Sequence, residues 1–386
     1  MSMLEASVRA NFGDFTCGTH RALIYALGGQ VVIGELTPLL AVQWNRIRDD
    51  ISQASVFVAS SKCCELLGNL RCISMELHIL RDDAEVWCGP ITRLEYDWDI
   101  CRVYAEDMLW VAKRRVLEVG YNQSYPNIGN VIDRMDWLLR TQCYGAYGDN
   151  WRMTAATTNH LHPLHHSGKE PGTTRVVNPY QVTIWEDFDK YAEDMGADYT
   201  VLGRDIYYWD NQLAWATLPP LTEEFISQFP RIVEYGNQLY NRAFVTNGRG
   251  YAGRADNPDP AMITSFGGPV DDLITNAEEG DDAKDPPAPE ELKSWSETAA
   301  HIIDGMAPAP VAVVIPANTT LMPGAPWNID SMLPGAWFQA EITQNLCRVV
   351  TEWQRINEVV VTESAPQGEV VQFTAASAPV HRVEPG

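Results

Sequence analysis

The chain has 386 residues, more than one ordinary domain needs, and its hydrophobic fraction of 45% is sufficient to form buried cores. Asp and Glu outnumber Lys and Arg by 51 to 28, which gives a formal net charge of -23. Because affinity for nucleic acid depends mainly on cations that neutralise phosphates, this charge argues against a nucleic-acid-binding surface, although an acidic wall would let DNA slide past without sticking.

Neither a membrane-spanning helix nor a signal peptide is expected. No apolar run reaches the ~18 residues that a membrane helix requires. The first residues, MSMLEASVRANFGD, lack the basic and apolar regions of a signal peptide. The 8 cysteines include no Cys-x-x-Cys pair. We therefore expect reduced, mostly buried thiols of a protein made in a cytoplasm, and no zinc on scattered cysteines.

Residues 1–116 are predicted to form a first β-barrel-like domain, because short runs of β-branched and aromatic residues alternate with turn residues. Gly28-Gly29 favours a hairpin, since both glycines can adopt positive φ. Asp82-Asp83 and Asp97–Asp99 mark two further hairpins. At Asp107 the hydrophobic period changes from two to about 3.6, which predicts a short amphipathic helix in MLWVAKRRVL.

Residues 117–230 are predicted to form an inserted α/β domain. A helical stripe predicts a first helix at about 128–142; its apolar positions are Ile128, Val131, Met135, Leu138 and Leu139. The Gly-, Thr-, Pro- and His-rich residues 144–180 indicate an extended loop.

The insertion continues with a second helix at about 184–195, because Thr183 and Glu186 form a capping box. Gly196 provides a left-handed stop for this helix. A hairpin is expected at about 198–209, in the sequence DYTVLGRDIYYW, with its turn at Gly203-Arg204.

Residues 231–376 are predicted to form a second β-rich domain, and 377–386 a tail. An acidic, Pro-rich linker is expected at about 271–290, followed by a helix at about 289–305 with proline in its first turn. The fold class is therefore α+β and mainly β, with two β-barrel-like domains that bracket an α/β insertion.

Four histidines within seven residues, His160, His162, His165 and His166, form the most distinctive local motif. Imidazoles at His-x-His spacing on an extended segment project to one side and are suitable ligands for zinc, nickel or iron. The alternative is a polar surface loop, in which Pro163 prevents regular structure. A second alternative is a structural metal site shared between subunits. A catalytic metal site is disfavoured, because the sequence contains no HExxH motif.

No other motif indicates catalysis or a cofactor. The sequence contains no GxSxG, no P-loop and no dinucleotide fingerprint, and the glycine-rich stretch NGRGYAGRA lacks the strand and helix that such a fingerprint needs. The 13 tryptophans and 15 tyrosines mostly alternate with polar residues, which is typical of core or interface aromatics. Sugar stacking is the alternative for some of them. We assign no catalytic residue and expect no cofactor.

Three stretches together resemble minor tail proteins of siphophages that infect actinobacteria. The first covers residues 19–96 and includes AVQWNRIRDDISQASVFV and KCCELLGNLRCISMELHILRDDAEVWCGPITRLEY. The second is residues 198–209, and the third is residues 315–376, which include LMPGAPWNIDSMLPGAWFQAEI and CRVVTEWQRINEVVVTE. The combination is specific, although no single motif would suffice. The histidine cluster is not a mark of that family.

The resemblance implies a tail-tip (baseplate) hub of a virion, a structural protein and not an enzyme. In that architecture three chains with two barrel domains each form a ring of six similar units around the DNA exit channel. The implied partners are further copies of the chain in a homotrimer, the ring of distal tail protein, the tape measure protein, the central fibre or spike, and other minor tail proteins.

Two other functions remain open from the sequence. One is a metal-dependent cell-wall hydrolase that uses the loop from His160 to His166. The other is a carbohydrate-binding adhesin at the tail tip.

Overall fold

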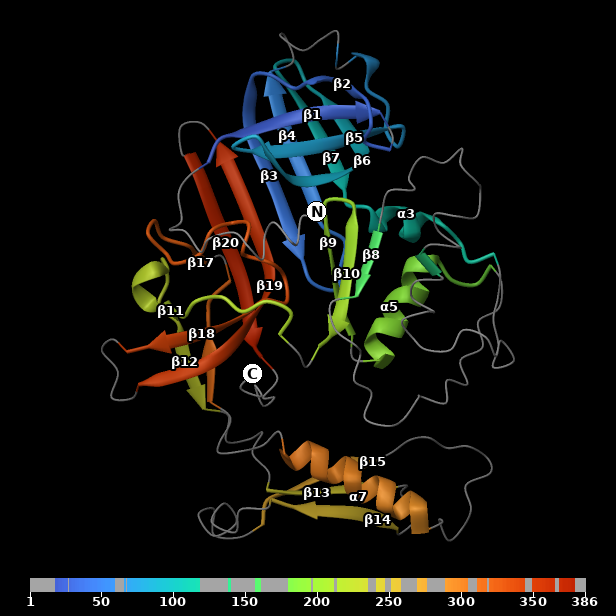
Figure 1. Cartoon of the computed structure of the whole chain (residues 1–386), viewed down its shortest axis with the longest axis vertical. Helices are drawn as coiled ribbons and strands as arrows, with labels where there is room; N and C mark the ends of the chain where they lie inside the picture. The colour runs from blue at the N-terminus through green and yellow to red at the C-terminus, as the bar shows by residue number, and fades with distance from the viewer. Residues whose placement is uncertain are drawn as a thin grey trace. The chain divides into compact units, whose positions relative to one another are not determined.

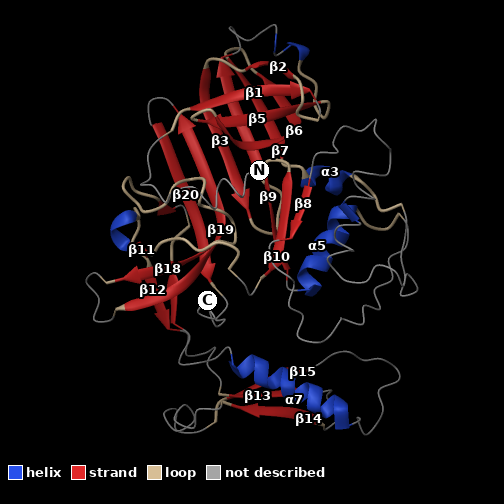
Figure 2. Cartoon of the chain, in the orientation of Figure 1, coloured by secondary structure: helices blue, strands red, loops and turns tan. Residues whose placement is uncertain are grey.

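The computed structural model describes residues 18–26, 28–59, 66, 68–118, 138–139, 157–160, 180–195, 197–211, 214–234, 241–246, 251–257, 269–275, 289–304, 311–317, 319–343, 349–364 and 368–378. The chain divides into two compact units. Unit 1 comprises Met1–Pro230 and Ile315–Ala378, and unit 2 comprises Arg231–Val314 and Pro379–Gly386. Strands predominate in the described residues, so the fold is α+β and mainly β, as predicted (Figures 1 and 2).

Unit 1 is built on a 12-stranded sheet. The first part of the chain contributes β1 (His20–Ala26), β2 (Val32–Glu35), β3 (Leu39–Ile47), β4 (Gln53–Ala59), β5 (Met75–Arg81), β6 (Ala84–Tyr96) and β7 (Ile100–Glu106). Later segments contribute β11 (Leu221–Thr222), β17 (Thr319–Thr320), β18 (Trp337–Ile342), β19 (Val350–Ser364) and β20 (Gly368–Ser377). The order is β11-β18-β19-β3-β4-β7-β6-β5-β1-β2, with β20 beside β19 and β17 beside β20.

The three hairpins expected in the first part of the chain form as β1–β2, β5–β6 and β6–β7. Both Gly28 and Gly29 have positive φ, as the first turn requires. Alternate residues of β4, such as Val56 and Val58, are buried, so this strand presents one face to a core. Figure 1 shows β1 and β5 crossing β3, β4 and β7. No ladder between described strands joins β1 to β3, so the sheet does not close into a barrel.

The closing strands extend the same sheet instead of forming a second domain over 231–376. The first half of β19 pairs with β18, and the second half pairs with β3 along the same edge, from Glu358↔Ile47 to Ser364↔Ala41. β20 occupies the opposite edge of β19. The length of β19, 15 residues, is what allows two strands to follow each other along one edge. The two β-rich ends of the chain therefore share one sheet within unit 1.

The insertion contains α5 (Ile184–Met195) and a three-stranded sheet of β8 (Thr157–His160), β10 (Asp205–Asp210) and β9 (Ala197–Leu202), in that order. The short helix α3 (Leu109–Arg114), which precedes the insertion, contacts α5. The predicted capping box is present: Thr183 N donates to Glu186 Oε2 at 2.7 Å, and Glu186 N donates to Thr183 Oγ1 at 3.2 Å. The β9–β10 hairpin turns at Gly203, where φ is 61°. Of the helix predicted at 128–142, only Leu138 and Leu139 are described, and both are buried.

The core of the insertion is aromatic. Phe188 of α5 meets Tyr199 of β9 and Tyr208 of β10 edge-on, at centroid distances of 5.1 and 6.5 Å. All three side chains are at most 1% exposed. Thr200 Oγ1 donates to Ile47 O at 2.8 Å, which attaches β9 to the end of β3. The insertion is therefore part of the same compact unit as the large sheet.

Unit 2 contains β13 (Arg242–Thr246) between antiparallel β14 (Ala252–Asp256) and parallel β15 (Asp271–Thr275), with α7 (Pro289–Asp304) against β13 and β14. A Cβ at Gly253 would lie 2.4 Å from Ser296 N, so glycine permits this close helix–strand contact. A two-stranded sheet pairs β12 (Arg231–Glu234) with β16 (Val311–Val314). The helix coincides with the one predicted at 289–305, whereas the first residues of the expected 271–290 linker form β15.

No described helix is long and apolar enough to cross a membrane.

Candidate functional site

Among the described residues, three buried clusters of ionisable side chains join segments of unit 1 that are far apart in the sequence. The first, the Asp198 cluster, brings Asp198 of β9 between two guanidiniums. Arg48 Nη1 donates to Asp198 Oδ1 at 2.8 Å, and Arg355 Nη1 donates to Asp198 Oδ2 at 2.6 Å. Arg48 follows β3 and Arg355 lies on β19, so one carboxylate links the insertion to both ends of the chain. A cavity of about 370 Å³ lies beside these side chains.

Asp49 adds a second carboxylate to the Asp198 cluster. Its Oδ2 lies 3.0 Å from Arg48 Nη1, and its Oδ1 accepts from Tyr199 N at 2.9 Å. Burial, together with the nearby charge of Asp198, raises the pKa of Asp49 to about 7. The cluster therefore holds a carboxyl group, that of Asp49, which titrates near neutrality.

The second cluster, the Glu76 cluster, is centred on a carboxylate of β5 whose side chain is fully buried. Glu76 accepts from Gly28 N at 2.7 Å, faces His78 Nε2 at 3.3 Å, and pairs with Arg204 from the β9–β10 turn. Burial alone would raise the pKa of Glu76, but the contacts with His78, Arg204 and Gly28 outweigh burial and hold it below its ordinary value. This cluster attaches the tip of the insertion hairpin to the first part of the sheet.

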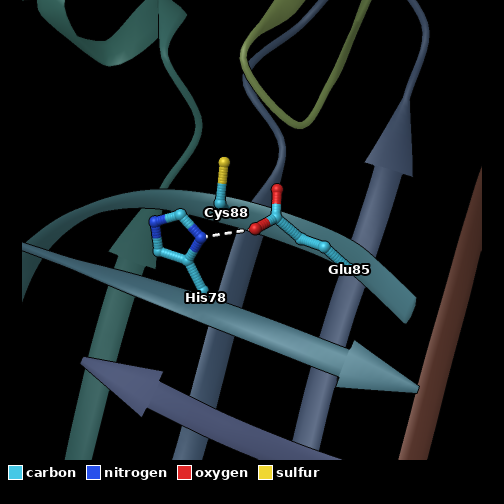
Figure 3. Close-up of side chains that lie close together, drawn as sticks. All are labelled: His78, Glu85 and Cys88. Carbon is cyan, nitrogen blue, oxygen red and sulfur yellow. Dashed lines mark hydrogen bonds and ion pairs between the residues drawn. The ribbon is translucent and has the colours of Figure 1, made fainter. Parts of the chain in front are cut away.

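His78 extends the Glu76 cluster to β6. Its Nδ1 lies 2.6 Å from Glu85 Oε2 (Figure 3), and the Tyr25 ring contacts its imidazole at a centroid distance of 4.0 Å, with the two planes tilted by 34°. Burial lowers the pKa of His78, but the hydrogen bonds with Glu76 and Glu85 raise it by more, so the net shift is upward. The imidazolium is therefore favoured between the two carboxylates.

The third cluster, the His20 cluster, joins β1 to the closing strands. Trp44 Nε1 donates to His20 Nε2 at 3.1 Å, which places the ring proton on Nδ1, where it is donated to Glu363 at 2.6 Å. Arg81 binds Glu369 through two hydrogen bonds of 2.7 and 2.9 Å. The Glu369 side chain is fully buried. A planar guanidinium is well suited to this bidentate contact.

These clusters stabilise the fold more readily than they could catalyse a reaction. Each carboxylate in them faces a guanidinium, an imidazole or a backbone N–H, so its charge is already compensated. Buried networks of this kind hold the strands that they join in a fixed arrangement. They connect the start, the middle and the end of the chain within unit 1.

The predicted histidine site lies almost wholly outside the described residues. Only the backbone of His160 is described, at the end of β8, where it pairs in parallel with Tyr208 of β10. His162, His165 and His166 are not described. Metal binding by these four histidines therefore stays a prediction.

Sequence reasoning missed the buried clusters because their members come from distant segments. One local signal was present: Glu76 and His78 lie two apart in the apolar strand MELHIL, so both point to one face. Two ionisable residues on the buried face of a strand require partners. The identity of the partner Arg204, from the β9–β10 turn, could not be read from the spacing.

Exposed apolar side chains mark a candidate assembly surface at the end of the β6–β7 hairpin. Trp98 in the turn is 94% exposed, and Tyr96 at the end of β6 is 58% exposed. We call these two residues the hairpin-end patch. Large exposed aromatic side chains are enriched at protein–protein interfaces.

Comparison with known proteins gives a structural match but no sequence match. No protein-family model and no curated protein matches the sequence. A tail protein from Neisseria meningitidis MC58 matches with a TM-score of 0.53 and 9% identity, over 93% of this chain and 96% of that chain. A 43 kDa tail protein of prophage MuSo2 from Shewanella oneidensis matches with a TM-score of 0.52 and 10% identity, over 93% of this chain and 98% of that chain.

The chain has the fold of these two tail proteins.

The shared fold agrees with the family resemblance of residues 19–96, 198–209 and 315–376, and extends beyond those stretches to most of the chain. The segments with the sequence resemblance are also those that unit 1 brings together, in the large sheet and in the β9–β10 hairpin.

Proposed function

We propose that this chain is a structural protein of a phage tail and forms part of the tail tip. The observation that supports this proposal most directly is the fold, which matches two phage tail proteins over 93% of the chain and over 96% or more of their own length. The buried ion clusters of unit 1 suit this role, because a tail component must hold its shape under mechanical load. Its activity is assembly, not catalysis.

The finer proposal is a trimeric hub of a siphophage that infects actinobacteria, with three chains around the DNA exit channel. The resemblance of residues 19–96, 198–209 and 315–376 to minor tail proteins supports this finer proposal. The formal charge of -23 also supports it, since an acidic lumen repels the phosphate backbone and lets DNA pass.

The proposed partners are the distal tail ring, the tape measure protein and the central fibre or spike. The hairpin-end patch supports a contact with one of them, because a turn that exposes Trp98 almost completely has an apolar surface to bury. Asp97 and Asp99 flank Trp98 in the turn. A groove of the partner protein that accepts the Trp98 side chain would therefore have apolar residues at its base and basic residues around its edge, opposite the two aspartates.

Immunogold electron microscopy of purified virions tests the location. An antibody against this chain is expected to label the end of the tail that is distal to the capsid. Labelling of the capsid, or labelled protein found only outside particles, would contradict the proposal.

The two alternative functions make different predictions. A metal-dependent cell-wall hydrolase would release soluble fragments from cell walls and lose this activity in a chelator, and the change of His162 and His165 to Ala would abolish it. An adhesin would bind isolated cell walls as a purified protein. We expect neither result.

A further inference from the structure

We propose that His78, Glu85 and Cys88 bind one divalent transition-metal ion, with zinc as the metal that best fits these donors. This site is separate from the histidine loop and goes beyond the proposed role in the tail. Its three donors are an imidazole nitrogen, a carboxylate oxygen and a thiol sulfur, the three donor types that zinc takes in proteins. In the structure the three donor atoms all lie within 4.8 Å of one another (Figure 3).

The strand register explains how the three side chains meet. His78 of β5 and Cys88 of β6 are direct cross-strand partners, so both point to the same face of the sheet. Glu85 is three residues from Cys88 and would point to the opposite face of a regular strand. The ladder, however, shifts from Ile79↔Trp87 to Leu80↔Glu85, which makes Val86 the extra residue of a β-bulge. The bulge returns Glu85 to the face of His78, and re-aiming a side chain is a recurrent use of bulges.

The distances require only a small adjustment for a tetrahedral ion. Zinc bonds of ~2.0–2.3 Å place donor atoms about 3.3–3.8 Å apart. His78 Nδ1 and Glu85 Oε2 are closer than that, at 2.6 Å. The Glu85 side chain is 32% exposed, so its carboxylate has room to move outward by about 1 Å, which the tetrahedral spacing requires. The His78 and Cys88 side chains are buried, and any pair of donor atoms near the 4.8 Å limit has to approach by about 1 Å to reach the tetrahedral spacing.

A second layer of contacts already orients the imidazole as a ligand. With Nδ1 directed at the donors, the other ring nitrogen of His78 faces Glu76, which is held by Gly28 N and Arg204. A metal-binding histidine almost always donates its second ring N–H to a carboxylate or carbonyl in this way. In the neutral ring that a metal ion would bind, this pairing keeps the proton on Nε2 and directs the lone pair of Nδ1 to the ion, and it increases the basicity of the ring.

A divalent ion balances the two negative charges of the Glu85 carboxylate and the Cys88 thiolate, since a thiol binds zinc only after it loses its proton. Three protein donors fill three of four tetrahedral positions, and a water molecule completes the set on the side of the partly exposed Glu85. The ion would lock β5 to β6 at the bulge, next to the point where Arg204 attaches the insertion.

Titration of the full chain with cobalt(II), after chelator treatment, tests this site, because cobalt replaces zinc and a cobalt–thiolate bond has its own absorption band. We expect a thiolate band that saturates at one equivalent, and zinc at one equivalent by elemental analysis of the zinc-treated, desalted protein. The absence of a thiolate band from the wild-type chain would overturn the proposal, whatever the behaviour of the variants.

Three variants assign the ion to these residues. Cys88→Ser is expected to lose the band and one equivalent of zinc, whereas Cys72→Ser, which changes an exposed cysteine, retains both. Alanine at His160, His162, His165 and His166 leaves the thiolate band unchanged. Glu76→Gln weakens zinc affinity by about 10–100-fold. A thiolate band that persists in Cys88→Ser, or that disappears in Cys72→Ser, would place the ion elsewhere. Thermal melting of each variant without metal shows whether it is folded.

Discussion

Removal of the Asp198 carboxylate should destabilise unit 1 more than removal of any single surface charge. The Asp198 side chain is 4% exposed and binds Arg48 and Arg355, which are 17% and 11% exposed. Loss of one member of a buried ion pair costs about 3–5 kcal/mol, because the remaining charges stay buried without a partner. In Asp198→Ala, Asp49 remains near both guanidiniums and loses the repulsion from Asp198. We therefore expect a cost at the lower end, about 3 kcal/mol.

Arg21→Ala is the matched control. Arg21 binds Glu35 and Asp83, but its side chain is 45% exposed, and those of Glu35 and Asp83 are 37% and 79% exposed. Exposed ion pairs contribute about 0–1 kcal/mol, since water solvates the charges when the pair is broken. The structure therefore predicts a large difference between two substitutions that each remove two ion pairs.

Urea unfolding of the full chain, followed by tryptophan fluorescence, measures this difference. The two compact units require a fit with two transitions, and the midpoint shift is interpreted only where the m value is unchanged. A cost below about 1 kcal/mol for Asp198→Ala, or equal costs for both variants, would refute the reasoning that the Asp198 cluster is buried and structurally important.

Three further predictions concern unit 1. Asp49→Asn removes a carboxyl group whose pKa is about 7 in the folded chain and ~3.9 in the unfolded chain. As the pH rises from ~4 to ~7, the stability of the wild-type chain should therefore fall relative to that of the variant, by up to ~1.4 kcal/mol per pH unit. Urea midpoints of the two chains that change in parallel with pH would contradict this. Trp327→Ala, at a fully buried side chain, should cost about 3–5 kcal/mol in the same assay, and a cost below ~1 kcal/mol would show that it is not packed. Gly335→Ala should lower the melting temperature measured by calorimetry, because φ is 81° and the new Cβ would lie 2.1 Å from Trp209 Cζ2; an unchanged melting temperature would exclude this close contact.

Local features of the fold could be predicted from the sequence, because neighbouring residues determine them. The capping box at Thr183 and Glu186 forms with both reciprocal hydrogen bonds, and the hairpin turn at Gly28-Gly29 has the positive φ values that glycine permits. The helix at 289–305 was also predictable, since a proline in the first turn and an amphipathic pattern suffice to identify it.

The pairing of strands that are distant in the sequence could not be predicted from the sequence. Alternating patterns at both ends of the chain indicate strands but do not say which strands are neighbours, so two separate barrels and one shared sheet give similar patterns. The pairing of β19 with β3 unites the two ends. The acidic residues around Asp271–Thr275 predict a linker, whereas this segment forms the edge strand β15 of the described sheet. An edge strand needs few apolar residues, and Leu273 is 65% exposed, so the composition of the segment does not reveal the strand.

The candidate metal site shows a further limit of sequence reasoning. Periodicity places Glu85 and Cys88 on opposite faces of a strand, and only the bulge at Val86 brings them together. Scattered cysteines gave no reason to expect a metal ligand at Cys88. In contrast, the four clustered histidines from His160 to His166 are obvious in the sequence, and their metal binding is still a prediction.

Quantitative mass spectrometry of purified virions tests the central claim most directly. A tail-tip hub built from three chains predicts three copies of this protein per particle, counted against a capsid protein of known copy number. Absence from purified virions would contradict the structural role in the tail, and a copy number that matches the repeated rings of the tail tube would contradict the location at the tip.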